Sequence, residues 1–147
     1  MTATAHALIG ASIAAAIPDP AIGIPLVAIS HPIADMIPHW DFGRGWKSKK
    51  KLVLFFQSIA DLTFGVILSY ILFGQSVSLT YLFLAILISE SWDILQAPYW
   101  LLNWKFPPFS YFYNFGHQTN STAKLPWGIL TQAATVTGLV LVLRVIH

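Results

Sequence analysis

Three ionisable side chains recur at intervals of four residues in the stretch His31-Pro-Ile-Ala-Asp35-Met-Ile-Pro-His39-Trp-Asp41. On an α-helix, positions i, i+4 and i+8 project from nearly the same face. The spacing therefore predicts one helical stripe with an imidazole, a carboxylate and a second imidazole, and Asp41 follows two residues later. Residues 21–30, which precede the stretch, are almost wholly apolar. Polar groups at the end of an apolar segment are costly to bury without a partner, so this stretch indicates a functional site.

The composition indicates that a membrane, rather than water, is the solvent of this chain. Its 147 residues are 56 % hydrophobic and 10 % charged, whereas an ordinary soluble domain has about 25 % charged residues. The mean hydropathy is +0.65. The length suits one domain, so residues 1–147 are predicted to form a single transmembrane domain. The chain has no cysteine, which excludes disulfides and thiolate metal sites.

Apolar runs along the chain predict an all-α integral membrane protein with four to five transmembrane or re-entrant helices. Residues 2–17 and 21–38 are shorter than the roughly 20 residues of a perpendicular span, so they either re-enter the membrane or pack as a thin hairpin. Residues 105–124 are interpreted as an aromatic, proline-containing loop. Three further runs are long enough to span, at residues 52–73, 78–104 and 125–145.

Basic residues set the expected orientation in the membrane. Four lysines cluster within residues 47–51, and Lys105 and Lys124 follow two helices later. Cytoplasmic loops carry an excess of Lys and Arg, so we expect both loops on the cytoplasmic side of a bacterial or archaeal cell membrane. A lysine cluster beside an apolar run faces anionic headgroups. Membrane lipids are therefore the expected partners and nucleic acid is not, while a homo-oligomer is left open.

Polar groups inside the expected spans lie toward the same side of the membrane. At 1.5 Å per residue, Asp61 and Asp93 lie ~15 Å from the helix ends that face the basic loops. Glu90 is one turn from Asp93 and on the same face. His6 lies near the same end of the first run, and His117 lies in the second basic loop. A charge within a span costs at least ~2.5–3.5 kcal/mol on insertion scales, so these groups need partners or a function.

Histidine and carboxylate side chains without thiolates predict a divalent metal, with zinc expected first and manganese or iron as alternatives. The candidate metal ligands are His31, Asp35, His39, His6, Asp41, Asp61 and His117. Glu90 and Asp93 are the candidate catalytic residues, which would complete the ligand set or act as a general base. Several of these residues have a plainer alternative. Asp61 can hydrogen-bond across helices, and His117 can be a solvated loop residue. His6 can be a histidine at a helix end, and His39 and Asp41 can belong to an interfacial anchor around Trp40.

A resemblance adds to this interpretation of the residues. Residues 4–6 (Thr-Ala-His) with Gly10, followed by a histidine and an Asp-Xaa-Xaa-Pro-His-Xaa-Asp element at residues 35–41, resemble the membrane-bound metal-dependent hydrolases. These are small multi-helix inner-membrane proteins with histidine and aspartate motifs near the N-terminus. The family commonly has a Pro-Asp-Xaa-Asp-His arrangement, whose parts occur in a different order in this chain. The resemblance covers residues 4–41 and implies metal-dependent hydrolysis.

The function expected from the sequence is metal-assisted hydrolysis of a lipid-like or phosphate-bearing substrate near the cytoplasmic headgroup level. Two other classes stay open. In a proton- or ion-coupled transporter, the same acids and histidines would form an ion path. In a non-enzymatic membrane assembly protein, they would hold the helices together.

Overall fold

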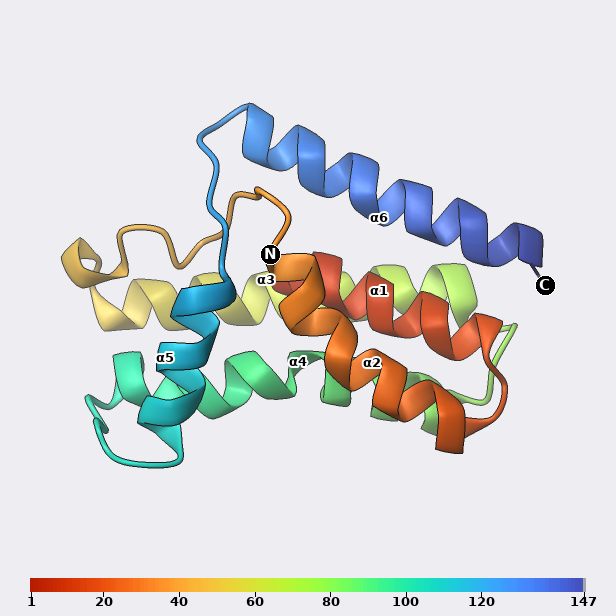
Figure 1. The fold of residues 1–147 in the computed structure, drawn as a ribbon, viewed down its shortest axis with the longest axis horizontal. Coiled ribbons are helices and arrows are strands. Elements are labelled where there is room, and N and C mark those ends of the chain that lie inside the picture. The colour runs from red at the N-terminus through yellow and green to blue at the C-terminus, as the bar shows by residue number, and fades with distance from the viewer. Residues whose placement is uncertain (147) are drawn as a thin grey trace.

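Six α-helices lie within residues 1–146, which are the part of the chain that the computed structural model describes (Figure 1). The prediction of an all-α fold is confirmed. The helices are α1 (Ala3–Ala16), α2 (Pro20–Asp35), α3 (Lys51–Phe73), α4 (Leu79–Leu101), α5 (Phe109–Thr119) and α6 (Trp127–Ile146), with a single 3-10 turn, η1 (Trp46–Ser48), before α3.

Helix α1 is the centre of the fold. It is apolar on every side and packs against α2, α3, α4 and α6 (Figure 1). Small residues permit the close packing: a Cβ added to Gly10 would lie 2.8 Å from the Ser89 Cβ on α4, and one added to Gly65 on α3 would lie 2.7 Å from the Thr4 Cα. Close backbone approach of this kind is typical of helices that pack within a membrane.

The turn at residues 17–19 joins α1 to α2 as the sequence predicts. Asp19 is the N-cap of α2, and its carboxylate accepts a hydrogen bond of 2.9 Å from the Ala21 N–H. Pro20 occupies the first helical position, where its missing N–H costs nothing. The carboxylate of Asp19 thus fixes the point at which α2 begins.

Helix α2 ends at Asp35, so the predicted helical run to residue 38 is too long by three residues. Pro38 disfavours the helical conformation of the residue before it, which ends the helix early. His39 is therefore not on the helical stripe that its spacing predicts. Its backbone instead lies beside residues 121–123: the His39 N–H donates to the Ser121 carbonyl at 3.0 Å, and the Ala123 N–H donates to the His39 carbonyl at 2.7 Å.

Helix α5 corrects the prediction that residues 105–124 form a loop. It starts directly after Pro107 and Pro108 and presents an aromatic face to α4. On that face, the ring of Tyr113 stacks on that of Tyr99 with centroids 3.8 Å apart. Phe112 and Phe115 contact the Trp92 ring at 5.3 and 5.1 Å. These aromatic contacts across helices stabilise a short helix that would be marginal alone.

Within the described residues, α3 and α4 are each 23 residues long and apolar enough to cross a membrane. At 1.5 Å per residue each spans ~34 Å, compared with a hydrocarbon core of about 30 Å. Helix α1 and the segment Trp127–Leu143 of α6 are apolar but shorter.

Candidate metal centre

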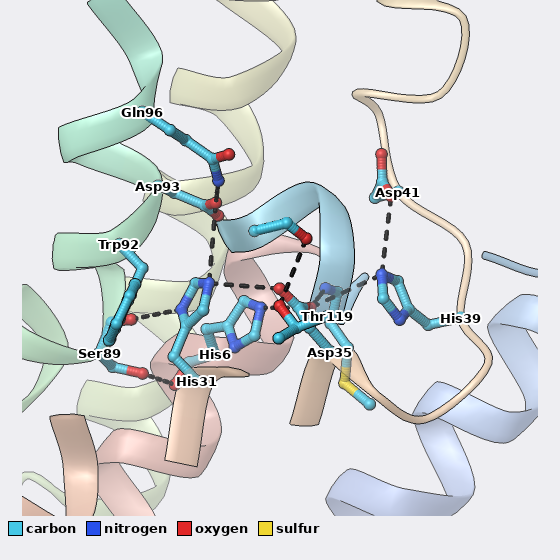
Figure 2. Close-up of polar contacts among 12 residues, drawn as sticks. His6, His31, Asp35, His39, Asp41, Ser89, Trp92, Asp93, Gln96 and Thr119 are labelled. Atoms are coloured by element: carbon cyan, nitrogen blue, oxygen red, sulfur yellow. Dashed lines mark hydrogen bonds and ion pairs between the residues drawn. The ribbon is translucent and has the colours of Figure 1, made fainter. Parts of the chain in front are cut away.

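The buried carboxylate of Asp35, at the end of α2, is surrounded by imidazole nitrogens (Figure 2). Its Oδ1 lies 3.1 Å from His6 Nε2 and 3.6 Å from His39 Nε2, and its Oδ2 lies 3.4 Å from His31 Nε2. The amino group of Met1 also contacts Oδ1. The three histidines are buried and come from α1, from α2 and from the segment that follows α2.

Two more carboxylates extend this cluster on opposite sides. Asp93 on α4 has its Oδ1 3.7 Å from His31 Nε2, and Asp41 has its Oδ2 3.6 Å from His39 Nε2 (Figure 2). Each of these two imidazoles therefore lies between two carboxylates. Burial opposes ionisation of Asp41, but the contacts with His39 and with the backbone N–H of Arg44 hold the pKa of its carboxyl below the ordinary value. Asp41 thus stays an anion at neutral pH.

Backbone carbonyls orient two of the imidazoles. His31 Nδ1 lies 2.6 Å from the Ser89 carbonyl oxygen, and His39 Nδ1 lies 2.7 Å from that of Ile37. A carbonyl only accepts, so each Nδ1 carries the hydrogen, and the Nε2 of the neutral ring is left with a bare lone pair. A hydrogen bond from the distal ring nitrogen to a carbonyl is how proteins fix metal-binding histidines.

The bare nitrogens face carboxylate oxygens, which are themselves acceptors. Two lone pairs that face each other in a buried site repel unless a cation, either a proton or a metal ion, lies between them. The rings of His6 and His31 are also stacked, with centroids 3.6 Å apart and an angle of 11° between their planes. The cluster is therefore built to hold positive charge.

One combination of these groups has the spacing of a metal site. One nitrogen each from His6 and His31 and one carboxylate oxygen of Asp93 lie within 4.8 Å of one another. Metal ligands of these types bind at about 2.0–2.2 Å, so small side-chain movements would close this set on one ion. The ligands come from α1, α2 and α4, so this triad can form only in the folded protein.

A hydrogen bond from Trp92 joins α4 to α2 beside this triad, and a proline in α2 frees the carbonyl that accepts it. Pro32 has no N–H, so the Ala28 carbonyl one turn earlier lacks its helical donor. The indole Nε1 of Trp92 donates to that carbonyl at 2.9 Å. Trp92 precedes Asp93, and Pro32 follows His31, so this bond fixes the two helices next to two of the candidate ligands.

The structure brings six of the nine sequence-predicted site residues together, namely His6, His31, Asp35, His39, Asp41 and Asp93. Asp61 lies apart from them. Its carboxylate accepts hydrogen bonds from the Ala3 N–H at 2.7 Å and from the Thr4 hydroxyl at 2.6 Å. Asp61 thus holds α3 to the first turn of α1, as its alternative interpretation expects.

His117 and Glu90, the other two predicted site residues, also lie outside the cluster. His117 is exposed on α5, and its ring lies parallel to that of Tyr113 with centroids 6.1 Å apart. Glu90 on α4 is buried, and its Oε1 has no hydrogen-bond partner among the residues that the structure describes. Neither residue makes an ion pair with the histidines in the described part of the chain.

Two features of the site were not predicted from the sequence. Gln96 donates from its Nε2 to Asp93 Oδ1, an interaction that the i, i+3 spacing on α4 could have indicated. A small cavity, with room for about one water molecule, opens beside His31 and Asp35, between α2, α4 and α5. The sequence gives no sign of this cavity, because α5 was not expected.

The fold and the site define an all-α protein with two helices able to cross a membrane and a buried histidine–aspartate cluster able to hold a metal ion. Comparisons with protein-family models, curated proteins and solved structures found no match to this chain. The resemblance at residues 4–41 therefore stays a prediction, and the function must be argued from the site.

Proposed function

We propose that this protein is a membrane-embedded metal-dependent hydrolase that acts on a lipid-like or phosphate-bearing substrate near the cytoplasmic headgroup level. The observation that carries the proposal is the convergence of His6, His31 and Asp93 from three helices to within 4.8 Å. Zinc suits these ligands best, and manganese or iron would also bind.

The chain's own residues have separable roles in this chemistry. A bound divalent ion would supply a nucleophile at neutral pH by lowering the pKa of a water molecule to about 7. Ser89 orients His31 through its carbonyl, and Gln96 orients Asp93. Asp93 acts as a ligand, which leaves Glu90, one turn away and with an unpartnered oxygen in the described structure, as the candidate general base.

The surroundings of the triad favour a substrate with an apolar part. The hollow beside His31 is lined by Trp92, Phe112 and Phe115 together with the amide side chains of Gln96 and Asn120. Ligand sites combine apolar walls with a few polar groups in this way. The hollow has room for about one water molecule, which is the second reactant of a hydrolysis.

The outer surface suits a lipid environment. Large apolar side chains project outward from α3 and are exposed, among them Phe55, Phe56 and Phe64. The exposed Lys50 and Lys51 stand at the start of the same helix, where they would meet anionic headgroups. We propose on these grounds that α3 and α4 cross the membrane and that α1, α2 and α6 complete a polytopic bundle.

Metal content and hydrolysis test the proposal together. Purified wild-type protein in detergent should retain at least one divalent ion per chain and hydrolyse a phospholipid in mixed micelles, and a chelator should abolish the hydrolysis. His31→Gln and Asp93→Asn should each lose both properties. Asp19→Asn, at the opposite end of α2, is the matched control and should keep both. Wild-type protein that binds no divalent ion at pH 7.5 would exclude the metal-dependent function.

A carrier is the second candidate, and Glu90 is the observation that favours it. A buried acid without a hydrogen-bond partner in the described structure, on a helix long enough to span, is typical of ion paths. Proteoliposomes distinguish the two functions. A carrier would move protons or ions across the vesicle membrane in a Glu90-dependent manner, whereas the hydrolase would show turnover without flux.

A further inference from the structure

The triad of His6, His31 and Asp93 is closed to molecules larger than water. The side chains of His6 and His31 are only 1 % and 3 % exposed, and that of Asp93 is 37 % exposed. The hollow beside His31 has room for about one water molecule. A phosphate-bearing headgroup is much larger than water, so it cannot reach the two imidazoles in this arrangement. Part of the protein must therefore move before such a substrate binds.

Helix α5 forms one wall of this hollow. It runs across α4 rather than along it, and its last turns lie beside the end of α2 (Figure 1). The residues of α5 that line the hollow, together with His31 and Asp35 of α2, are Phe112, Phe115, Gly116 and Thr119. A movement of α5 away from α4 would therefore widen the hollow beside His31.

Helix α5 is also the most loosely held helix around the site. None of its residues is buried, and within residues 1–146 no backbone hydrogen bond joins Phe109–Thr119 to another helix. Ring contacts with α4, such as that of Phe115 with Trp92, hold it in place. Only the segment after it is tied down, because the Ser121 N–H donates to the Asp35 carbonyl at 2.8 Å. Segments with few buried contacts are the ones that open at low cost in free energy, so α5 can swing about its C-terminal end.

One contact links the position of α5 to the candidate metal ligands. A Cβ on Gly116 would lie 3.1 Å from Gln96 Oε1, so the glycine lets α5 lie directly against the Gln96 amide. The Nε2 of the same amide donates to Asp93 Oδ1. When α5 lies on α4, it therefore confines the side chain that orients Asp93.

We infer that α5 is a lid: it opens to let the substrate reach His6, His31 and Asp93, and on closing it sets Asp93 through Gln96. The inference rests on the proposed function for the metal position and adds how access to that position is controlled. Lids of enzymes act in these two ways, because closure both excludes water and completes the arrangement of the reacting groups.

A reversible link between α4 and α5 tests the lid. The rings of Tyr99 and Tyr113 stack with centroids 3.8 Å apart, and the chain has no cysteine of its own. In the Tyr99→Cys, Tyr113→Cys double variant, a short bis-methanethiosulfonate reagent joins the two helices, and a reductant removes the link. Protein loaded with Mn²⁺ is mixed with EDTA, and electron paramagnetic resonance follows the release of the ion.

The linked protein should release Mn²⁺ at least about 10-fold more slowly than the same protein after reduction, because exchange at a covered site follows the opening of its lid. The reagent should not change the release from either single-cysteine variant. Equal release from the linked and the reduced protein would show that the metal is reached without movement of α5, and would overturn the lid.

A looser lid should have the opposite effect, and this test needs no link. Phe115→Ala removes the ring contact with Trp92 and should speed both binding and release of Mn²⁺ about 2- to 10-fold, the change expected for the loss of one aromatic pair. The Kd should stay near that of wild type, because both rates change together. Tyr111→Ala, at an exposed ring of the same helix, is the matched control and should change neither rate. A raised Kd with an unchanged binding rate would mean that Phe115 supports the ligands instead, and would contradict the lid.

Hydrolysis of a phospholipid in mixed micelles separates this inference from the proposed function. Slow release of Mn²⁺ from the linked protein, without hydrolysis by the reduced protein or by wild type, would support the lid and overturn the hydrolase. Hydrolysis at the same rate by the linked and the reduced protein would overturn the lid and leave the hydrolase intact. Hydrolysis that the link stops and the reductant restores is the result expected if both are correct.

Discussion

At the scale of single residues, the site depends on hydrogen bonds that orient its candidate ligands. The carbonyls of Ser89 and Ile37 each take the Nδ1 hydrogen of one imidazole and thereby decide which nitrogen is free. The carboxylate of Asp93, which is partly exposed, has its orientation set by Gln96. Such supporting contacts matter because a metal ligand that is free to rotate loses affinity.

Gln96→Leu tests this dependence. The leucine keeps much of the bulk of the side chain but cannot donate to Asp93, so the carboxylate loses the contact that aims it at His31. We expect metal affinity to fall about 10- to 100-fold, the range found for supporting residues of metal sites. Competition with a chromophoric chelator measures the change. An unchanged Kd in a folded variant would show that Gln96 does not position Asp93.

At the scale of helices and loops, the sequence predicts best where hydrophobic runs are long. The run at residues 52–73 differs from α3 by one residue, because an uninterrupted apolar segment between polar turns leaves little choice. The end of α2 has a local cause in Pro38, which the apolar run alone does not show. The position of His39 and the whole of α5 could not be predicted in this way. Both depend on contacts between distant segments, as the pairing of His39 with Ser121 and the stacking of Tyr113 on Tyr99 show.

In the candidate site too, contacts within one helix could be predicted from the sequence, and contacts between distant segments could not. The spacing of four residues correctly associates Asp35 with His31, because both lie on α2. It associates His39 with Asp35 for the wrong reason, since His39 lies beyond the helix and approaches from the segment that pairs with residues 121–123. The types of residue that meet could be predicted from the sequence, whereas the geometry of their hydrogen bonds could not.

Two glycines allow a matched test of helix packing. A Cβ on Gly65 would lie 2.7 Å from the Thr4 Cα, a backbone atom that cannot yield, whereas one on Gly138 of α6 would meet nothing within 4 Å. Gly65→Ala should therefore destabilise the protein by about 1–3 kcal/mol. Gly138→Ala should be neutral or stabilise it by up to about 1 kcal/mol, because alanine is the better helix former. Unfolding in mixed micelles of detergent measures both, and equal effects would contradict the packing of α1 on α3.

At the scale of the whole molecule, the polar groups collect where α1 begins and α2 ends, beside the middle of α3 and α4 (Figure 1). Asp61, near the middle of α3, binds the first turn of α1, and Asp93 on α4 faces His31. The contacts of Asp35 with His6 and of His31 with Asp93 bring histidines and acids from different helices together. If α3 and α4 span a membrane, the loop after α2 and the linker before α6, which flank this site, lie on one side of it.

The last prediction concerns which side of the membrane the loop after α2 and the linker before α6 face. The loop after α2 and the linker before α6 lie together, since Arg44 donates to the Ala123 carbonyl at 2.8 Å. Both therefore belong on one side of the bundle, and their lysines predict that this side faces the cytoplasm. The chain has no cysteine, so single cysteines at Ser48, Ser121 and Ser76 can be labelled without background.

An impermeant thiol reagent added to intact cells should label Ser76→Cys, in the turn between α3 and α4, and spare Ser48→Cys and Ser121→Cys until the cells are opened. Labelling of Ser48→Cys without Ser121→Cys in intact cells would contradict the arrangement of the helices, whereas labelling of both without Ser76→Cys would retain the fold and reverse its orientation.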